Sequence, residues 1–552
     1  MRSRASTQRA RSPPLTLGRS PAASRSATRS PSGGSPAATP PTARAEEANV
    51  STRSSSVDVV VIGFGAAGIA AAITAHDEGA QVVVLEKAPP ETAGGNTRAA
   101  GQVWYSPHDE ELAKEYLRGL AYDMPIPDDV VDAWASEQVR NNDWMTARAA
   151  EAQGHIDVDP RDPFGQGVTF EAHTYQEAVK RQTGWDVPRD EFPEFNNEGG
   201  TEWVTFGGTQ GHSRVWLRLK AALEQRDVEI RYSTAATAIV TDGDGRVTGV
   251  EVLGPDGAET ITARRGVVNA AGGFENNPEM IRTYLGLPYV TPWGTPHNTG
   301  DGIRMGQALG ADLQNMYQHM PMFGIALEGL ETGEFVQPGG PAFIQVAQDG
   351  RRFISEATAY RHGKSTIGGR LEFYPHRAMW TVFDETVRTA GPLTAPHEAW
   401  AAGWEKQVVG YVWSDDNMVE IEKGWITKAD TIRELAEKLG VDPDGLEAEI
   451  ERWNAACAQG EDPYFGRPAE MMAPITEPPY YGYKWGNLLI ATMGGLRKNG
   501  KAQVLHVSGQ PIPGLYAAGE ISSTFTWALG GGQSIADAIG FGRIAGREAA
   551  AG

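Results

Sequence analysis

Three glycines with the spacing G-x-G-x-x-G, Gly63, Gly65 and Gly68, lie in the segment VVVIGFGAAGIAAA. Gly63 would let the chain leave a strand sharply, Gly65 would let backbone amides approach a pyrophosphate, and Gly68 would let a helix pack closely. The helix N-terminus would then face the phosphates. Glu86 follows 23 positions after Gly63, where its carboxylate can accept both ribose hydroxyls of an adenosine. The pattern predicts a dinucleotide site.

Further glycine-rich segments indicate which dinucleotide to expect. Residues 94–101, GGNTRAAG, follow the second strand, and their small side chains would let backbone approach a pyrophosphate and an isoalloxazine edge. Near the C-terminus, Glu520 follows a strand and can reach ribitol hydroxyls. The turn at residues 530–532 opens a final helix at Ser534, whose N-terminus would stabilise negative charge on a reduced flavin. FAD is therefore the expected cofactor.

The expected cofactor-binding residues come from separate stretches along the chain. They are Gly63, Gly65, Ala67, Gly68, Glu86, Lys87, Gly94, Gly95, Asn96, Thr97, Gly101, Gly272, Gly302, Gly519, Glu520, Ser534 and Ile535. No metal ligands are expected.

Apolar runs predict the elements that place these residues. Val59–Ile62 and Val82–Leu85 are typical of strands buried on both faces, and a small-residue helix is expected over Ala66–His76 between them. Residues 267–274, VVNAAGGF, suit a further strand that enters the nucleotide domain. Residues 425–457 show the apolar stripes of two amphipathic helices. At 552 residues the chain exceeds the size of one core, so two packed domains are expected.

Composition excludes several classes of function. A formal charge of -21 disfavours binding to nucleic acid or to an anionic membrane, and no apolar run reaches the length of a membrane span. A single cysteine, Cys457, excludes an internal disulfide and a cysteine metal cluster. A cytoplasmic enzyme fits these features best.

Residues 1–56 are rich in Ser, Arg, Pro and Ala, and we expect a disordered tail there. Two explanations of this tail stay open. It is either an organelle transit peptide or basic arm, or the product of a mispredicted start codon with translation beginning near Val50.

Four further motifs complete a family resemblance. TGDGIRMGQALGA from Thr299, DGRRFISEATAYR from Asp349, GEDPYFGR from Gly460 and TMGGL from Thr492 occur in this order. With the glycine-rich segments, they make the chain from about Val57 resemble the superfamily of fumarate reductases and 3-ketosteroid dehydrogenases.

The resemblance implies an α/β fold in which an α+β capping domain is inserted into a Rossmann-like FAD-binding domain. The implied boundaries are 57–322 and 477–552 for the FAD-binding domain and 323–476 for the capping domain. Family members with covalent flavin carry a histidine where this sequence has Asn96, so FAD is expected to bind non-covalently.

The resemblance also suggests candidates for catalysis. Arg361 stands where the fumarate reductases carry their catalytic acid, but the family's Glu and Arg relay positions are Gln337 and Gly340 here. The positions of two further carboxylate-binding groups are Ala528 and Ile490 or Ala491. His319 either corresponds to a family substrate histidine or is an ordinary hydrogen-bonded one.

Aromatic side chains stand near these neutral positions. In PPYYGYKWG, Tyr481 matches a tyrosine with which ketosteroid dehydrogenases help to enolise a ketone, and Tyr317 is a second candidate acid or base. The first hypothesis is therefore hydride exchange with a carbon–carbon bond next to the carbonyl of a neutral cyclic ketone.

The alternative enzyme is a fumarate reductase-like reductase of a small unsaturated acid that uses Arg361. A third possibility is a flavoprotein without catalysis that serves as an electron carrier. The sequence encodes no electron partner of its own, because it lacks a haem motif and a second nucleotide site. An external donor or acceptor is therefore expected for either enzyme.

Overall fold

The computed structural model describes residues 53–155, 172–174, 202–206, 214–357, 361–367, 370–373, 379–394 and 402–552. Residues 1–52 of the tail expected over 1–56 lie outside these described ranges. The expectation is wrong for Arg53–Ser56, because these residues begin strand β1 and pair with Glu259–Thr262.

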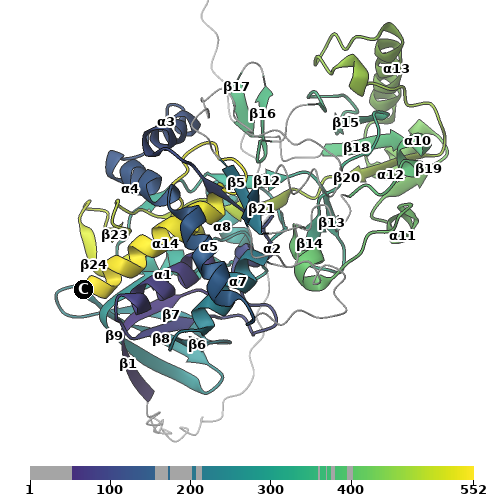
Figure 1. The fold of residues 1–552 in the computed structure, drawn as a ribbon. Helices are drawn as coiled ribbons and strands as arrows, with labels where there is room; N and C mark the ends of the chain where they lie inside the picture. The colour runs from purple at the N-terminus through teal and green to yellow at the C-terminus, as the bar shows by residue number, and fades with distance from the viewer. Residues whose placement is uncertain are drawn as a thin grey trace, which may run out of the picture. The chain divides into compact units, whose positions relative to one another are not determined.

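A largely parallel sheet carries the nucleotide-binding segments (Figure 1). Its strands run in the order β23-β24-β9-β1-β2-β6, and β7 and β8 extend it antiparallel along β9. From β24 to β6 every neighbouring pair is parallel. The bounds are β1 Arg53–Ile62, β2 Val82–Leu85, β6 Glu229–Arg231, β7 Ala235–Thr241, β8 Val247–Gly254, β9 Gly257–Asn269, β23 Gln503–Leu505 and β24 Pro511–Ala517. This confirms the Rossmann-like α/β fold.

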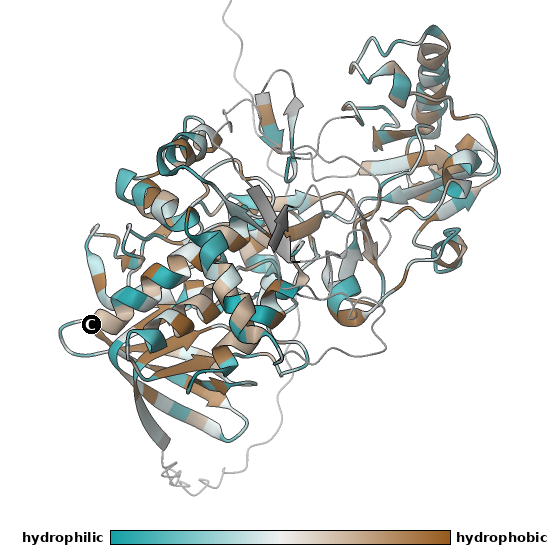
Figure 2. Ribbon diagram, viewed as in Figure 1, coloured by the Kyte–Doolittle hydropathy of each residue, from teal (hydrophilic) through white to brown (hydrophobic). Residues whose placement is uncertain are grey.

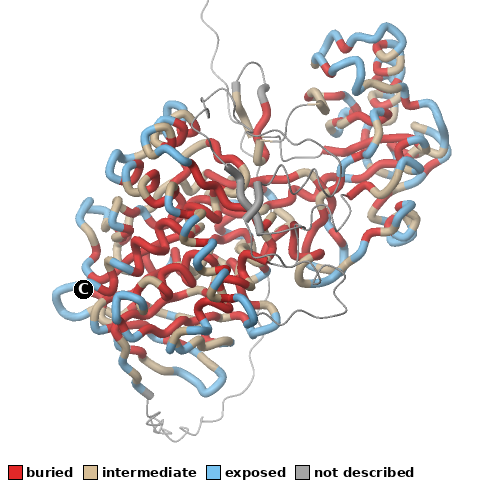
Figure 3. The backbone as a smooth tube through the Cα atoms, in the orientation of Figure 1, coloured by how far each residue is buried: buried red, intermediate tan, exposed pale blue. Residues whose placement is uncertain are grey.

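Val59–Ile62 of β1 and all of β2 are apolar because both faces of the sheet are buried there (Figures 2 and 3). Val59 and Val61 of β1 pack into the cluster that contains the helices α1 and α14. Val60 and Ile62 point to the opposite face, into a second cluster with residues of β8 and β9. The continuous apolar run follows from this alternation.

Helices cover the first face. Helix α1, Ala66–Asp77, follows the glycine-rich turn, and α14, Gln533–Ala551, packs against it. A Cβ on Gly546 of α14 would lie 2.3 Å from the backbone oxygen of Ala71, so the two backbones approach closely. The remaining helices on this side are α3 Glu110–Ala121, α4 Asp128–Gln138, α5 Asn141–Ala152 and α7 Arg214–Glu224.

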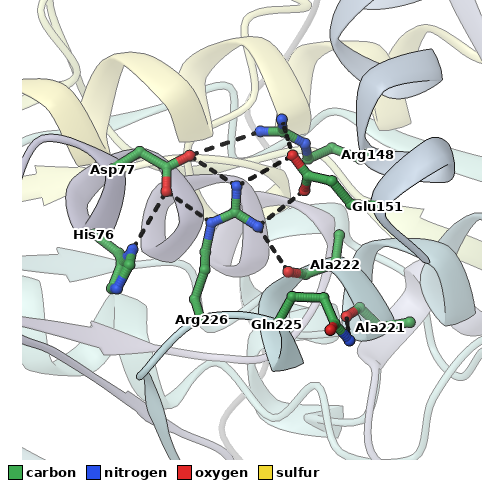
Figure 4. Close-up of polar contacts among 8 residues, drawn as sticks. All are labelled: His76, Asp77, Arg148, Glu151, Ala221, Ala222, Gln225 and Arg226. Atoms are coloured by element: carbon green, nitrogen blue, oxygen red, sulfur yellow. Dashed lines mark hydrogen bonds and ion pairs between the residues drawn. The ribbon is translucent and has the colours of Figure 1, made fainter. Parts of the chain in front are cut away.

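An ion-pair cluster joins three of these helices at their ends (Figure 4). The Arg226 guanidinium donates to both carboxylate oxygens of Asp77, at 2.7 and 2.8 Å, and to Glu151 at 2.9 Å. Arg148 contacts the same two acids. These bonds raise the pKa of Arg226 and lower that of Asp77, so the cluster stays charged across the physiological range.

A second, antiparallel sheet has the order β15-β18-β20-β19, and we call it the cap sheet. Its strands are β15 Phe343–Ala347, β18 Met379–Asp384, β19 Thr427–Ala429 and β20 Tyr480–Lys484. Helices α12, Ile432–Leu439, and α13, Pro443–Gln459, bury their apolar stripes against it, as the sequence predicts. Because β20 pairs with β18, the capping segment extends beyond the boundary expected at 476.

The other named helices and strands are short. They are α2 Gly95–Ala99, β3 Val103–Ser106, β4 Ala172–Thr174, β5 Glu202–Phe206, α8 Pro278–Met280, β10 Thr291–Pro292, α9 Asp301–Ala308, β11 Leu313–Gln314, β12 His319–Met322, β13 Ile325–Leu327, β14 Thr332–Glu334, β16 Lys364–Ile367, β17 Arg370–Phe373, α10 Glu385–Thr389, α11 Met418–Glu422, β21 Leu488–Thr492 and β22 Gly495–Leu496. In the part of the chain that the structure describes, no helix has the length and apolar character to cross a membrane.

Candidate active site

One cavity of about 1260 Å³ gathers most of the predicted cofactor residues. Those that line it are Gly63, Gly65, Ala67, Glu86, Lys87, Gly95, Asn96, Thr97, Gly101, Gly272, Gly519, Glu520, Ser534 and Ile535. Gly68, Gly94 and Gly302 do not line it. They lie behind its wall, where a Cβ on each would come within 2.6 Å of a neighbouring group.

The glycine-rich turn has the geometry that its motif requires. Gly63 adopts φ +101°, and a Cβ there would lie 2.3 Å from the Ala270 carbonyl oxygen. A Cβ on Gly68 would lie 2.0 Å from the Gly63 oxygen, so only glycine lets α1 start this close to β1. The Thr97 hydroxyl accepts a hydrogen bond from the Ala66 amide at 2.9 Å and closes the turn against α2.

Glu86 and Lys87 stand at the carboxyl end of β2. The Glu86 carboxylate accepts from the Ala88 and Phe64 amides, at 2.7 and 3.2 Å, and its burial raises its pKa. The Lys87 ammonium donates to Asp301 at 2.6 Å, so its charge is already compensated at the cavity wall.

Asn96 links three segments that are far apart in the sequence. Its Nδ2 donates to Glu275 at 2.6 Å and to Glu520 at 2.9 Å, and its Oδ1 accepts from the Thr295 amide at 2.9 Å. Sequence reasoning missed Glu275, whose only signal was its position directly after the predicted strand and paired glycines.

The cavity fits a long dinucleotide because glycines from separate segments, among them Gly63, Gly65 and Gly519, line its wall. Gly63, Gly65 and the α1 N-terminus would hold a pyrophosphate, and Glu86 stands where an adenosine ribose would lie. Glu520, which also lines the cavity, would face a ribityl chain. The N-terminus of α14, beside Ser534, would face the flavin ring.

Comparison with known proteins decides between FAD and other dinucleotides. Residues 58–535 match the model of the FAD binding domain family. The chain belongs to this FAD-binding family. It is an FAD-dependent oxidoreductase acting on CH–CH groups, related to ketosteroid dehydrogenases and fumarate reductases.

Two curated relatives illustrate this relationship. The 3-oxosteroid 1-dehydrogenase of Mycobacterium tuberculosis is 29% identical, and the alignment covers 88% of this chain and 97% of the relative. The NADH:acrylate oxidoreductase of Vibrio harveyi is 28% identical over 89% of this chain, which matches 50% of that longer protein.

Solved structures show the same fold. The 3-ketosteroid delta1-dehydrogenase of Sterolibacterium denitrificans superimposes with a TM-score of 0.68 at 24% identity, covering 90% of this chain and 99% of that one. A flavocytochrome c3 fumarate reductase in an open conformation gives a TM-score of 0.64 at 24% identity, covering 90% and 79%.

The rest of the flavoprotein's cavity is mainly apolar. Its apolar side chains away from the nucleotide turn include Trp293, Met320, Met322, Phe335, Leu393 and Ile490. The polar lining residues include Gln337, Arg361, His362 and Thr394. Arg361 is thus the predicted catalytic residue that the structure brings to the cavity. Glu356, a possible ion-pair partner for it, is instead paired with Arg352 at 2.5 Å.

The two predicted tyrosines lie elsewhere, and this corrects their proposed roles. Tyr481 is buried in the core of the cap sheet, stacks on Phe383 and donates its hydroxyl hydrogen to Glu385 at 2.7 Å. The Tyr317 hydroxyl donates to the Thr526 carbonyl at 2.7 Å. Neither tyrosine lines the cavity.

His319 also fails to line the cavity. Its Nδ1 lies 3.0 Å from the Tyr317 carbonyl oxygen, and its ring stacks on Phe373 with the centroids 4.3 Å apart. These contacts favour the interpretation of an ordinary hydrogen-bonded histidine.

A buried polar network backs the cavity on its capping side. The Thr394 hydroxyl, which lines the cavity, accepts from Lys406 at 2.7 Å and donates to Glu334 at 2.8 Å. Lys406 also pairs with Glu334 at 2.9 Å, and Glu405 accepts from the Trp293 indole at 3.1 Å. Burial and the neighbouring Glu334 raise the pKa of Glu405 well above its usual value.

Sequence reasoning missed this network, because the chain gives no sign that Glu334 and Glu405 meet. In the described ranges, no set of His, Cys, Asp and Glu side chains is arranged to hold a metal ion.

Proposed function

We propose that this flavoenzyme exchanges a hydride with a carbon–carbon bond next to the carbonyl of a neutral, largely apolar cyclic ketone of the 3-ketosteroid kind. The observation that carries the proposal is the cavity wall away from the nucleotide turn, where the lining includes Met, Phe, Trp, Leu and Ile side chains and, among the described residues, one arginine, Arg361. Such a wall suits an apolar body with one polar end. Bound FAD supplies the hydride-exchanging centre.

Arg361 takes the role of orienting and polarising the carbonyl. A guanidinium that donates to the ketone oxygen stabilises the negative charge that develops there when the adjacent C–H bond breaks. Tyr481 has no part in this step, because its hydroxyl is engaged by Glu385 inside the cap sheet. The Thr394 hydroxyl, backed by Lys406, is a second polar group within the cavity wall.

The relatives support a ketone substrate. The 3-oxosteroid 1-dehydrogenase aligns over 97% of its own length and 88% of this chain. The acrylate oxidoreductase is matched over only 50% of its length.

A second candidate function is reduction of a small unsaturated carboxylic acid. Arg361 favours it, because this arginine reaches the cavity while both tyrosine candidates do not. For this second function a monocarboxylate would suit the cavity better than a dicarboxylate. The described wall away from the nucleotide turn offers one arginine, Arg361, rather than several cations.

We also propose that FAD is held without a covalent bond and passes electrons to an external partner. Asn96 supports the first point, because its carboxamide is occupied by Glu275, Glu520 and Thr295 and offers no imidazole for attachment. Acid precipitation should therefore release all the flavin into the supernatant. Flavin that stays with the pellet would contradict this.

Anaerobic bleaching of the bound flavin tests the substrate class. The holoenzyme is mixed with 4-androstene-3,17-dione, other cyclic ketones, succinate or propionate. We expect a ketone to bleach the flavin, and Arg361→Ala to slow this by about 10²- to 10³-fold, the usual effect of removing a donor to a developing oxyanion.

Arg351→Ala is the matched control, because this nearby arginine is exposed and pairs only loosely with Asp349, at 3.9 Å. Tyr481→Phe should leave the rate of bleaching unchanged. Bleaching by a carboxylic acid alone, or reoxidation of reduced enzyme by acrylate that depends on Arg361, would establish the second candidate instead.

A further inference from the structure

Two carboxyl groups, that of Glu520 in the wall of the FAD cavity and that of Glu275 behind it, share their hydrogen-bond donors. Glu275 is 2% exposed, and its Oε1 accepts from Asn96 at 2.6 Å and from Asn298 at 2.8 Å. The same two amides donate to Glu520 Oε2, at 2.9 and 3.3 Å. The Thr492 hydroxyl lies 3.4 Å from Glu275 and 3.3 Å from Glu520. Each polar neighbour therefore bridges both acids.

In this arrangement only one of the two carboxyl groups can be ionised. Two carboxylates that share donors in a buried site repel each other, so one of them retains a proton. Burial raises the pKa of both acids, and the neighbouring Glu275 raises that of Glu520 further. No cation is among the main influences on either group.

The charged and titratable groups on the surrounding segments are engaged with other partners. Lys87 pairs with Asp301 at 2.6 Å. His297, next to Asn298, approaches Thr92 at 3.2 Å. Asp537 accepts from Thr524 at 2.6 Å. A proton shared between the two acids is thus the simplest way to balance their charge.

We infer that Glu275 is a positioning residue for the cofactor site: it shares one proton with Glu520, and FAD binding depends on that proton. Glu520 lines the cavity where the ribityl chain would lie, whereas Glu275 stands behind it. Loss of the proton would place a second negative charge beside a cofactor whose pyrophosphate is already anionic, and the two acids would push apart.

FAD affinity as a function of pH tests the inference. Apoprotein is titrated with FAD between about pH 6 and about pH 9, the range into which buried glutamates can shift, and binding is followed by quenching of flavin fluorescence. We expect the Kd of the wild type to rise by up to about tenfold per pH unit once the shared proton is lost.

Glu275→Gln should show a much flatter pH profile of FAD binding than the wild type. The carboxamide keeps the hydrogen bonds of the protonated acid but cannot ionise. Glu279→Gln is the matched control on the same segment, because this carboxyl is exposed and pairs with Arg304 at 3.2 Å. It should keep the wild-type slope.

A wild-type Kd that does not change with pH would overturn the inference, as would a Glu275→Gln profile as steep as the wild type. If Glu275→Gln does not fold, Glu520→Gln carries the same test: weaker binding with a flat profile supports the shared proton, and a steep profile rejects it. The titration uses FAD alone, so its outcome is independent of the proposed substrate.

Discussion

Glu405 illustrates how a single buried carboxyl can set the response to pH. Its folded-state pKa lies well above the usual value because burial and Glu334 oppose its ionisation. The folded state then binds more protons than the unfolded state above the usual glutamate pKa. The stability that the protonated form confers is therefore present at low pH and is lost as pH rises toward the folded pKa.

Replacing Glu405 by glutamine should reduce this loss. The carboxamide oxygen can still accept from Trp293, and its NH₂ can donate to Glu334. Between about pH 6 and about pH 9, we expect the free energy of unfolding of Glu405→Gln to fall less than that of the wild type, by on the order of 1 kcal/mol. Urea unfolding at the two pH values measures this.

Glu437→Gln, on the exposed face of α12, should change the free energy of unfolding equally little at both pH values. If Glu405→Gln and the wild type lose stability in parallel, Glu405 ionises normally in the folded protein.

The limits of sequence reasoning show clearly at Tyr481. Its motif fixed a position in the chain but not the face of the strand on which the side chain lies. In β20 neighbouring side chains point to opposite faces, and Tyr481 points into the cap core. By contrast, the glycines at 63 and 68 were predictable because their role is steric and local.

The Glu275–Glu520 and Glu334–Glu405 pairs join residues distant in sequence, and only the fold brings them together.

At the level of elements, the contact between α1 and α14 depends on the absence of a side chain. We expect Gly546→Ala to lower the free energy of unfolding by about 1–3 kcal/mol, because its Cβ would come within 2.3 Å of the Ala71 backbone oxygen. Gly243→Ala is the control, since a Cβ there meets nothing within 4 Å and the residue has no left-handed φ. Urea unfolding of both variants measures their free energies of unfolding. Equal stabilities would show that the helices can separate without cost.

Elements whose signal is local agree closely with the structure. The strand predicted over Val82–Leu85 has those bounds, and the final helix begins one residue before the predicted Ser534. The prediction that the capping domain ends at residue 476 failed, because the strand propensity of the segment YYGYK does not show which other strand that segment pairs with. Its partner, β18, lies about a hundred residues earlier in the chain, and that pairing puts β20 in the cap sheet.

At the scale of the whole molecule, residues 52–552 form one compact unit that contains separate apolar clusters. Ile539 of α14 belongs to the cluster behind the FAD cavity, and Ile344 of β15 belongs to the cluster of the cap sheet. Both are fully buried, so truncation of either to alanine should cost about 2–5 kcal/mol.

FAD binding should distinguish the two variants. Ile539 lies on the helix whose first turn lines the cavity, so Ile539→Ala should weaken FAD binding several-fold, whereas Ile344→Ala should leave the Kd within about twofold. Thermal unfolding with and without excess FAD gives a second measure, because a ligand stabilises the folded state in proportion to RT ln(1 + [L]/Kd). Equal losses of affinity in the two variants would mean that the cap core and the cofactor site respond as one cooperative structure. An effect confined to Ile539→Ala would mean that the cavity tolerates a weakened cap, so substitutions on the capping side could then be used to change the substrate without loss of the flavin.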